Sequence, residues 1–453
     1  MKALIKVPRR NMKEAELAPF NDPLFLISLA LLPYLFYVSM VGILVVLINL
    51  IRAFRRPCLD PLTVGCLVTT SSLMMVSAGR SPYPGEAFLQ LSNFLPYMLM
   101  FAYLPGLFRT AALFERLAIA LVLTAIPINL IAVGEYLLKS PRLPKSWQAI
   151  NWVDAIHSAP HAGRAMTVFD HPNVMASYLV VVLGLGLGMV ALQCIRPLVV
   201  PIRPPMFVGM TLLNLVGIFC TGSRNGLAIA LIQLLIFVSV ARLSRRMIAI
   251  LTGVVGAIAT GAITFGLGVR QISILNVTDD PRVGLWKIAL DLIQQRPWLG
   301  WGLGSFKFLY PSRLIDPEYQ DIFHPHNIWL LLGAESGLMV MIILTVMVAF
   351  VCYRAVRYSF RPNHQVSSQE NRAIAIAYLL AFFGCVGFAL FDITFYDVRT
   401  NALNWTILAA LYTVSYRFQE QTQGQFNTQT QSATPANEEL NQRMTDSAEE
   451  TND

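Results

Sequence analysis

The sequence predicts an all-α protein that crosses a membrane many times. Of its 453 residues, 55% are hydrophobic and only 13% are charged, roughly half the charged share of an average soluble protein. A chain of this composition cannot cover its own surface with polar groups, so most of it must contact lipid or other helices. Apolar runs of roughly the 20 residues that a spanning helix needs recur along the chain. Helical hydrophobicity on all sides excludes a soluble enzyme and an outer-membrane barrel.

Eleven apolar runs carry the predicted spans. The first, 24–51, is too long for one plain span and contains Pro33, so it is either one kinked helix or a tight helical pair. The other ten lie at about 61–79, 88–108, 117–138, 172–193, 206–221, 226–241, 248–267, 328–353, 373–393 and 401–416. Placing the clusters of Lys and Arg in the cytoplasm makes 24–51 cross twice, which gives about twelve spans and two cytoplasmic termini.

Composition divides the chain into four predicted parts. A basic cytoplasmic tail at 1–23 precedes N-terminal transmembrane helices at 24–162, and a second transmembrane region at 163–417 contains a long outer loop at 268–327. The tail at 418–453 has a net charge of −6, against +14 for the rest of the chain, and its polar composition is typical of disorder. Basic excess on a membrane protein indicates orientation and contact with anionic lipid, so the lipid bilayer is an expected partner and nucleic acid is not.

Polar residues that could carry chemistry gather in loops predicted to lie on the outer side, at 139–171, 221–226 and 268–327. The predicted spans between 172 and 267 contain no Asp, Glu, Lys, Arg or His, and Glu335 and Asp392 are the main exceptions elsewhere. Ion-coupled transporters usually keep ionisable groups at mid-membrane. The distribution therefore favours a site at the outer membrane face.

The turn TGSRNG at 221–226 predicts an anion site. Its two Gly allow a tight reversal, and the helix that follows presents its first N–H groups outward, with the Arg224 guanidinium beside them. Ser223 and Asn225 flank Arg224 and are assigned to the same substrate-binding site. The structural alternative is a Gly-rich turn whose Arg reaches lipid headgroups.

A second cation stands at the start of a helix in the long outer loop. Asp280 suits the N-cap of this helix and Pro281 its first position. At 100° per residue, Arg282 falls on the apolar face that Trp286 shares, so its charge is aimed at protein or membrane. Such an Arg can clamp a phosphate, or it can belong to an interfacial helix and reach for headgroups.

The motif HPHN at 324–327 leads directly into the predicted span at 328. A His beside a helix N-terminus is pushed toward its neutral form, which a general base needs near pH 7. Asn327 is the predicted N-cap, and Glu335, two turns deeper, needs a buried partner.

Metal binding is the rival interpretation of the two histidines. His324 and His326 could join Asp316 or Asp321 around an ion. Their spacing matches no strong metal signature, so we predict no metal.

Taken together and in order, these segments resemble the bacterial O-antigen ligase / O-antigen polymerase family. The resemblance runs from Gly163 to about Asp397. Its parts are FDHPNVMA at 169–176, the TGSRNG turn, Arg282 with Trp286, PWLGWGLGSF at 297–306, and HPHN with Glu335 and Gly337.

The resemblance implies an architecture like that of the C-type, lipid-dependent glycosyltransferases (GT-C), with a large periplasmic loop. It implies an enzyme of cell-envelope polysaccharide biosynthesis at the outer face of the inner (plasma) membrane. There a glycan moves, with inversion, from a polyprenyl diphosphate carrier such as undecaprenyl diphosphate to a hydroxyl of a glycan, lipid or protein acceptor. No metal and no other cofactor is expected.

Carried over to this chain, the resemblance makes Arg224 and Arg282 the ligands of the diphosphate and His326 the general base, with His324 ranked second. The substrate-binding residues that we predict are Ser223, Asn225, Trp286, His324, Asn327 and Glu335.

Members of the family differ in what they do. A ligase passes a finished glycan to another acceptor, and a polymerase passes a growing chain to another carrier-linked repeat. The alternative from another class is a membrane component of inorganic-carbon (bicarbonate) uptake, as in cyanobacterial members of the family. The near absence of ionisable groups in the spans disfavours direct bicarbonate pumping.

Overall fold

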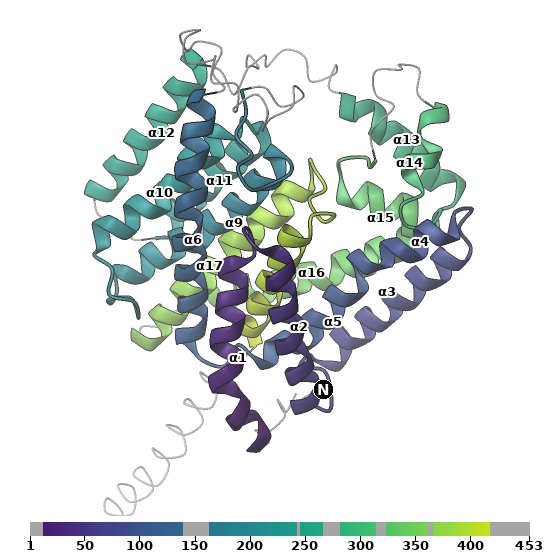
Figure 1. The fold of residues 1–453 in the computed structure, drawn as a ribbon, viewed down its shortest axis with the longest axis horizontal. Helices are drawn as coiled ribbons and strands as arrows, with labels where there is room; N and C mark the ends of the chain where they lie inside the picture. The colour runs from purple at the N-terminus through teal and green to yellow at the C-terminus, as the bar shows by residue number, and fades with distance from the viewer. Residues whose placement is uncertain are drawn as a thin grey trace, which may run out of the picture.

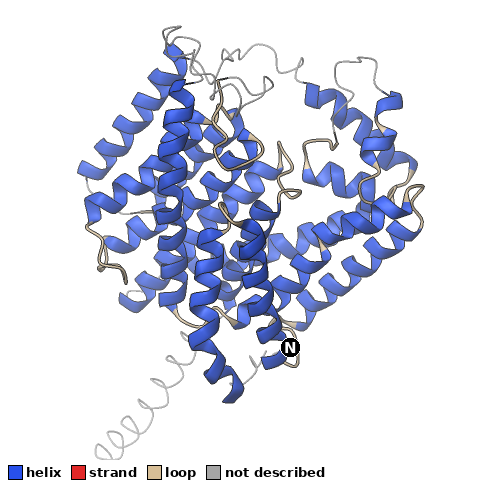
Figure 2. Cartoon of the chain, in the orientation of Figure 1, coloured by secondary structure: helices blue, strands red, loops and turns tan. Residues whose placement is uncertain are grey.

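The computed structural model describes residues 12–138, 163–241, 245–265, 281–313, 323–360 and 366–416, and all regular structure within these ranges is helical (Figure 2). The helices are, in chain order, α1 (Met12–Leu31), α2 (Phe36–Ala53), α3 (Pro61–Gly79), α4 (Pro84–Gln90), α5 (Leu95–Tyr103), α6 (Ala111–Leu138), α9 (Pro172–Gln193), α10 (Pro204–Cys220), α11 (Arg224–Val240), α12 (Arg245–Phe265), α13 (Pro281–Gln295), α14 (Phe306–Leu309), α15 (Ile328–Ser336), α16 (Leu338–Ser359) and α17 (Val366–Ala389). A last helix covers residues 398–416. The predicted N-cap Asp280 and the polar tail at 418–453 lie outside the described residues.

Seven helical segments are long and apolar enough to cross a membrane, within the ranges that the structure describes. They are Phe36–Ala53, Pro61–Gly79, Pro84–Gly106, Ala111–Leu138, Pro172–Gln193, Leu338–Ser359 and Gln369–Ala389. Three shorter apolar helices, Pro19–Leu31, Pro204–Cys220 and Arg224–Val240, accompany them. The prediction of an all-α, multi-pass membrane protein is confirmed, whereas the number of twelve spans stays a prediction.

The long apolar run at 24–51 forms two helices instead of one kinked helix. The chain leaves α1 after Leu31 and enters α2 at Phe36, with Pro33 in the break. A proline within a helix removes a backbone hydrogen bond and clashes with the preceding turn, which explains the position of the break. The two helices pack side by side (Figure 1), so the helical pair is the correct alternative.

The predicted single span at 328–353 is wrong, because the chain breaks at Gly337 into the short helix α15 and the long helix α16. Gly337 has φ +89°, and a Cβ there would collide with the Trp298 carbonyl group. The Leu338 N–H also donates to the Pro297 carbonyl oxygen at 2.8 Å. The outer loop therefore inserts its backbone at this point, and α15, with nine residues, lies outside the helices long enough to span.

The centre of the bundle is the pair α9 and α17 (Figure 1). A Cβ on Gly184 or Gly188 of α9 would overlap α17, so glycine lets the two helices approach closely. Gln233 of α11 donates to the carbonyl oxygens of Val180 and Leu380, at 2.9 and 2.8 Å, and so ties α11 to both. This rigid centre holds the start of α9 and the end of α17, which carry part of the site described below.

A second, smaller hydrophobic core lies outside the bundle, where α13, α14 and α15 come together (Figure 1). Its buried residues are Leu285, Ala289, Leu292, Ile293, Phe306, Tyr310 and Ala334. The Trp301 indole N–H donates to the Leu292 carbonyl oxygen at 2.9 Å, which fastens the glycine-rich loop at 297–306 to α13. This unit presents the HPHN motif to the bundle.

Candidate functional site

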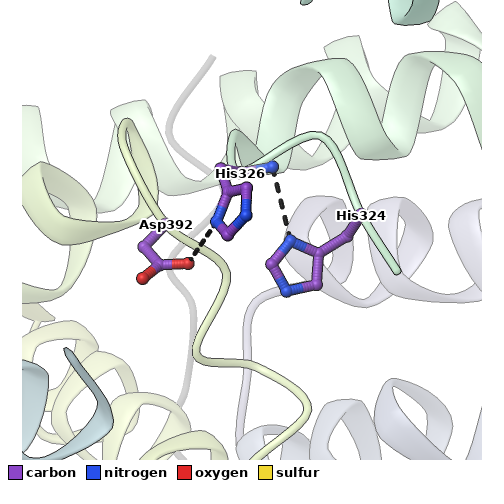
Figure 3. A group of neighbouring side chains, drawn as sticks. All are labelled: His324, His326 and Asp392. Carbon is purple, nitrogen blue, oxygen red and sulfur yellow. Dashed lines mark hydrogen bonds and ion pairs between the residues drawn. The ribbon is translucent and has the colours of Figure 1, made fainter. Parts of the chain in front are cut away.

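His326 and Asp392 form a hydrogen-bonded pair that the sequence did not predict (Figure 3). His326 Nδ1 lies 2.8 Å from Asp392 Oδ1, and Asp392, just after α17, is only 5% exposed. Because a carboxylate only accepts, the pairing assigns a proton to Nδ1, and in the neutral imidazole this leaves a lone pair on Nε2. The backbone of His326 has φ +52°, a strained conformation for a residue other than glycine. Because Nδ1 is bonded to Asp392, the other ring nitrogen, Nε2, faces away from the carboxylate.

The protonation of the groups around His326 follows from burial and pairing. Burial alone would raise the pKa of Asp392, but the hydrogen bond and electrostatic attraction of His326, with smaller contributions from His324 and from the Asn173 hydrogen bond, outweigh burial and lower it. Burial, and secondly the neighbouring His326, lower the pKa of His324 to about 4. At neutral pH the site therefore holds an ionised Asp392 and a neutral His324.

Every residue of the HPHN motif has a partner that fixes its position. His324 Nδ1 accepts from the His326 backbone N–H at 3.3 Å, and its ring stacks on Tyr396. The Pro325 carbonyl oxygen accepts from the Trp286 indole N–H at 2.9 Å. Trp286 therefore joins α13 to the motif.

Asn327 is the N-cap of α15, as predicted. Its Oδ1 accepts from the Leu330 N–H at 3.0 Å. Its Nδ2 donates to the Leu390 carbonyl oxygen at 3.0 Å, two residues before Asp392. In this structure the amide thus links the motif to the loop that carries the carboxylate.

The TGSRNG turn joins α10 to α11 and has a tightly bonded backbone. Gly222 has φ +60°, and the buried Ser223 caps α11 by accepting from the Gly226 N–H at 3.2 Å. Asn225 is partly buried. Arg224, the first residue of α11, is exposed and makes no hydrogen bond or ion pair to any part of the chain that the structure describes. Its charge is available to a ligand.

A chain of side-chain hydrogen bonds connects the two motifs. Asn173, near the start of α9, donates from Nδ2 to Asp392 Oδ2 at 2.6 Å. Arg164 donates from Nη2 to Asn173 Oδ1 at 2.7 Å and from Nε to the Thr221 carbonyl oxygen at 2.8 Å. The histidine pair and the turn that carries Arg224 thus belong to one network.

The sequence contained a weak signal for this network. Asp392 stood out as an acid at the end of a predicted span, and Asn173 lies in the FDHPN part of the resemblance. Arg164 carried no signal beyond its nearness to that motif. The pairing of His326 with Asp392 could be recognised only from the fold.

Arg282 is partly buried near the start of α13, one turn before Trp286. Residues four apart lie on the same helix face. Because Trp286 contacts Pro325, Arg282 is on the face of α13 that adjoins the HPHN motif.

Glu335 has an occupied carboxylate instead of one open to a ligand. Its two oxygens accept from the N–H groups of Gly304 and Phe306, at 2.8 and 2.9 Å, and the side chain is fully buried. Burial raises the pKa of Glu335 to about 7, although these two donors lower it. Gly304, like Gly300 and Gly302, has positive φ. Glu335 therefore holds the glycine-rich loop at 297–306 in place, and its predicted role in substrate binding stays a prediction.

His324, His326 and Asp392 place one potential metal-ligand atom each within 4.8 Å of one another. Asp316 and Asp321, the acids that the sequence offered, lie outside the described residues. A metal on Nδ1 of His326 would have to displace the proton shared with Asp392. The hydrogen-bonded arrangement accounts for the cluster without an ion, so metal independence stays a prediction.

Residues 209–345 match the family model described as O-antigen ligase. No curated protein matches the chain. The matched stretch covers less than a third of the chain and contains Arg224, Arg282 and His326, whereas Asn173 and Asp392 lie outside it. The match indicates ligase- or polymerase-type glycosyl transfer in polysaccharide biosynthesis. Over residues 209–345 the chain resembles the O-antigen ligase family, as its motifs predicted.

Proposed function

We propose that the protein transfers a glycan, with inversion, from a polyprenyl diphosphate carrier to an acceptor hydroxyl at the periplasmic face of the inner membrane. The observation that carries the proposal is the His326–Asp392 pair, joined by hydrogen bonds to the turn of Arg224. A base that can take a hydroxyl proton is thus joined by hydrogen bonds to the turn that carries a cation able to bind a diphosphate. The O-antigen ligase match over this region supports the same chemistry.

The proposed reaction assigns one task to each group. The acceptor oxygen attacks the anomeric carbon of the glycan from the side opposite the diphosphate. The new bond from carbon to the acceptor oxygen forms as the bond from carbon to the phosphate oxygen breaks. The acceptor proton moves to Nε2 of His326, and the ionised Asp392 stabilises the resulting imidazolium. The diphosphate leaves with the electron pair, and Arg224 and Arg282 bind its growing charge.

An apolar groove between α16 and α17 supports a lipid-linked substrate. Two cavities of about 300 and 260 Å³ adjoin there and share Cys352, Phe382 and Val386. Along α16 and its C-cap residue, the lining extends from Leu344 to Phe360, a length of about 24 Å at 1.5 Å per residue. The lining is almost wholly apolar, and both helices are able to span a membrane. A hydrocarbon chain fits such a groove.

One end of this groove borders the candidate site. Its lining residues there include Ile328, two positions after His326, and Ala389 and Phe395, which flank Asp392 in sequence. A carrier whose tail occupies the groove would therefore place its diphosphate near the histidine pair. This continuity supports dependence on a lipid carrier.

We also propose the topology that the basic residues predict. About twelve spans in a GT-C-like arrangement place both termini in the cytoplasm and the site in the periplasm. In the structure, the start of α11, the start of α9 and the end of α17 all contribute to the site. The site is thus built at helix ends instead of at the middle of spans, which supports an outer-face reaction.

The test is the glycan profile of a gene-deletion strain that carries wild type, Arg224→Ala or Arg52→Ala. Arg52 is an exposed arginine of α2 outside the proposed site and serves as the control. Wild type and Arg52→Ala should restore the surface glycan, and Arg224→Ala should leave glycan on the carrier. Full-length chains on the carrier indicate a ligase, and single repeats indicate a polymerase.

Two results would overturn the proposal. One is full activity of a correctly inserted Arg224→Ala protein. The other is an unchanged glycan profile with impaired uptake of inorganic carbon, which would favour the transport alternative.

A further inference from the structure

We propose that Asn173 and Arg164 are positioning residues that set the protonation of His326 and fix the position of His326 relative to the turn that carries Arg224. The catalytic meaning of this inference rests on the proposed function. The hydrogen bonds from which the inference is argued do not depend on the proposed function. Neither residue is expected to touch the reacting atoms, because both act through Asp392 and Thr221.

Asn173 shares the carboxylate of Asp392 with His326. Asp392 Oδ1 accepts from His326 Nδ1 at 2.8 Å and from the Ile393 N–H at 2.9 Å, and Oδ2 accepts from Asn173 Nδ2 at 2.6 Å. Each donor draws part of the negative charge toward itself. The bond from Asn173 therefore reduces the charge that faces His326 and makes the imidazole easier to deprotonate.

Arg164 fixes the orientation of the Asn173 amide. Arg164 is a donor only, so it must face the amide oxygen, and Asp392 is an acceptor, so it must face the amide nitrogen. Arg164 is 7% exposed, and its charge lies one side chain away from the carboxylate with little water between them. It strengthens the effect of Asn173 by polarising the amide and by its own field.

The same two residues link the base mechanically to the Arg224 turn. Arg164 Nε donates to the Thr221 carbonyl oxygen at 2.8 Å, and the Ala165 N–H donates to the Cys220 carbonyl oxygen at 2.9 Å. Cys220 is the last residue of α10, and Thr221 is its C-cap and the first residue of the turn. A displacement of the turn is thus transmitted through Arg164 and Asn173 to the histidine pair.

The ionisable groups near His326 come from several elements. The loop after α17 supplies Asp392 and Tyr396, the HPHN segment supplies His324, the start of α9 supplies His171, and the loop before α9 supplies Arg164. Arg282 on α13 adjoins the motif, and Arg399 forms a separate ion group with Asp170 and Asp397. Among these groups, Arg164 and Asp392 are the charged members of the chain of bonds that ends at His326.

The test measures the reactivity of His326 with diethyl pyrocarbonate as pH changes. The full-length protein in detergent is modified briefly, and the His326 peptide is quantified by mass spectrometry. Only the unprotonated imidazole reacts, so the midpoint of the curve reports protonation without any glycan substrate. Asn173→Ala should move the midpoint upward by roughly 0.5 to 1 pH unit, because more of the Asp392 charge then faces the ring.

Three further variants separate charge from folding. Arg164→Gln removes the charge and should also raise the midpoint, whereas Arg164→Lys keeps the charge and should shift it less. Asn129→Ala breaks another buried asparagine pair, with Asn214 at 3.0 Å, and should lower thermal stability without moving the midpoint. Asn173→Ser replaces Asn173→Ala if the latter fails to insert.

An unchanged midpoint in both the Asn173 and the Arg164→Gln proteins would overturn the inference. If the variants raise the midpoint but the wild-type protein transfers no carrier-linked glycan, the positioning role of Asn173 and Arg164 stands and only the proposed function is overturned. Where transfer is measured, a fall in kcat with little change in KM is expected for Asn173→Ala. A rise in KM alone would contradict a role in holding the base.

Discussion

The HPHN segment and the TGSRNG turn differ in how their key side chains are held. His326 is bonded to Asp392, its backbone N–H donates to His324, and the neighbouring Pro325 accepts from Trp286. The backbone of the TGSRNG turn is also held by hydrogen bonds, but the Arg224 side chain is exposed and makes no hydrogen bond within the described part of the chain. In the proposed reaction, the protein itself thus supplies the partner of the base His326, whereas the partner of the cation Arg224 is the ligand.

This difference is the one that a transfer from a diphosphate requires. A base must have its tautomer and direction fixed before the substrate arrives, and a carboxylate on Nδ1 does this. A cation for the leaving group must instead stay unneutralised until the diphosphate is present.

Loss of the base should have the largest effect. His326→Ala removes the group that takes the hydroxyl proton, and transfer should fall roughly 10³- to 10⁴-fold. The measurement is the amount of transferred glycan in membranes that contain equal amounts of inserted protein. His171→Ala is the comparison variant, since the His171 side chain caps α9 by accepting from the Asn173 N–H, and it should retain more transfer than His326→Ala. Equal losses in the two variants would indicate that the histidine effect is structural.

The second-largest fall in transfer is expected when the charge of Asp392 is removed. Asp392→Asn keeps the shape of the side chain but no longer fixes the Nδ1–H tautomer or stabilises the imidazolium, and transfer should fall about 10³-fold. Because a neutral partner holds the imidazole proton less firmly, the acid limb of the pH–rate profile should also move to lower pH. A profile that keeps its wild-type midpoint would show that Asp392 does not face the titrating group.

Arg224→Ala should lower the rate of transfer about 10²-fold, because it removes one charged donor to the leaving group. Arg224→Lys keeps the charge without the planar fork and should recover part of the rate. The comparison is made with saturating acceptor and varied carrier-linked donor. If alanine and lysine behave alike, or if both match wild type, the turn does not bind the diphosphate.

The smallest effect on transfer is expected at Glu335, where the change should appear in stability. The pKa of Glu335 is raised from 4.5 to about 7, so the folded protein binds more protons than the unfolded chain between these values. Its contribution to stability therefore falls as pH rises through this window. The unfolding temperature of wild type should drop between about pH 5 and 7.5, and Glu335→Gln should flatten that drop.

The control for this prediction is Asp291→Asn on α13. Asp291 is exposed, so its removal should leave the wild-type dependence on pH in place. A wild-type unfolding temperature that rises across the same window would contradict the direction derived for Glu335.

Much of the fold was predictable because apolar runs and helix caps are local features. The pair α1–α2, the seven long apolar helices and the cap at Asn327 follow from composition, proline position and side-chain chemistry. The break at Gly337 was not predictable in the same way. It depends on Trp298 and Pro297 lying against that residue, a contact that no run of hydrophobic residues encodes.

The site was predictable as a set of motifs but not as a network. Arg224, Arg282 and His326 stood out by residue type at helix starts, whereas Asp392 meets His326 across 66 residues and Asn173 across 219. Hydrophobic patterning marks where spans end but not which ends face each other. Glu335 shows the same limit, since only the fold reveals that backbone N–H groups are its partners.

The most direct test of the central claim uses purified full-length protein and the carrier-linked glycan that accumulates in the deletion strain. Release of polyprenyl diphosphate with an acceptor is compared for wild type and His326→Gln, which retains a polar side chain but no base. Wild type should release diphosphate and form product with inverted configuration, and His326→Gln should leave the glycan on its carrier. Equal release by the two proteins would contradict the account.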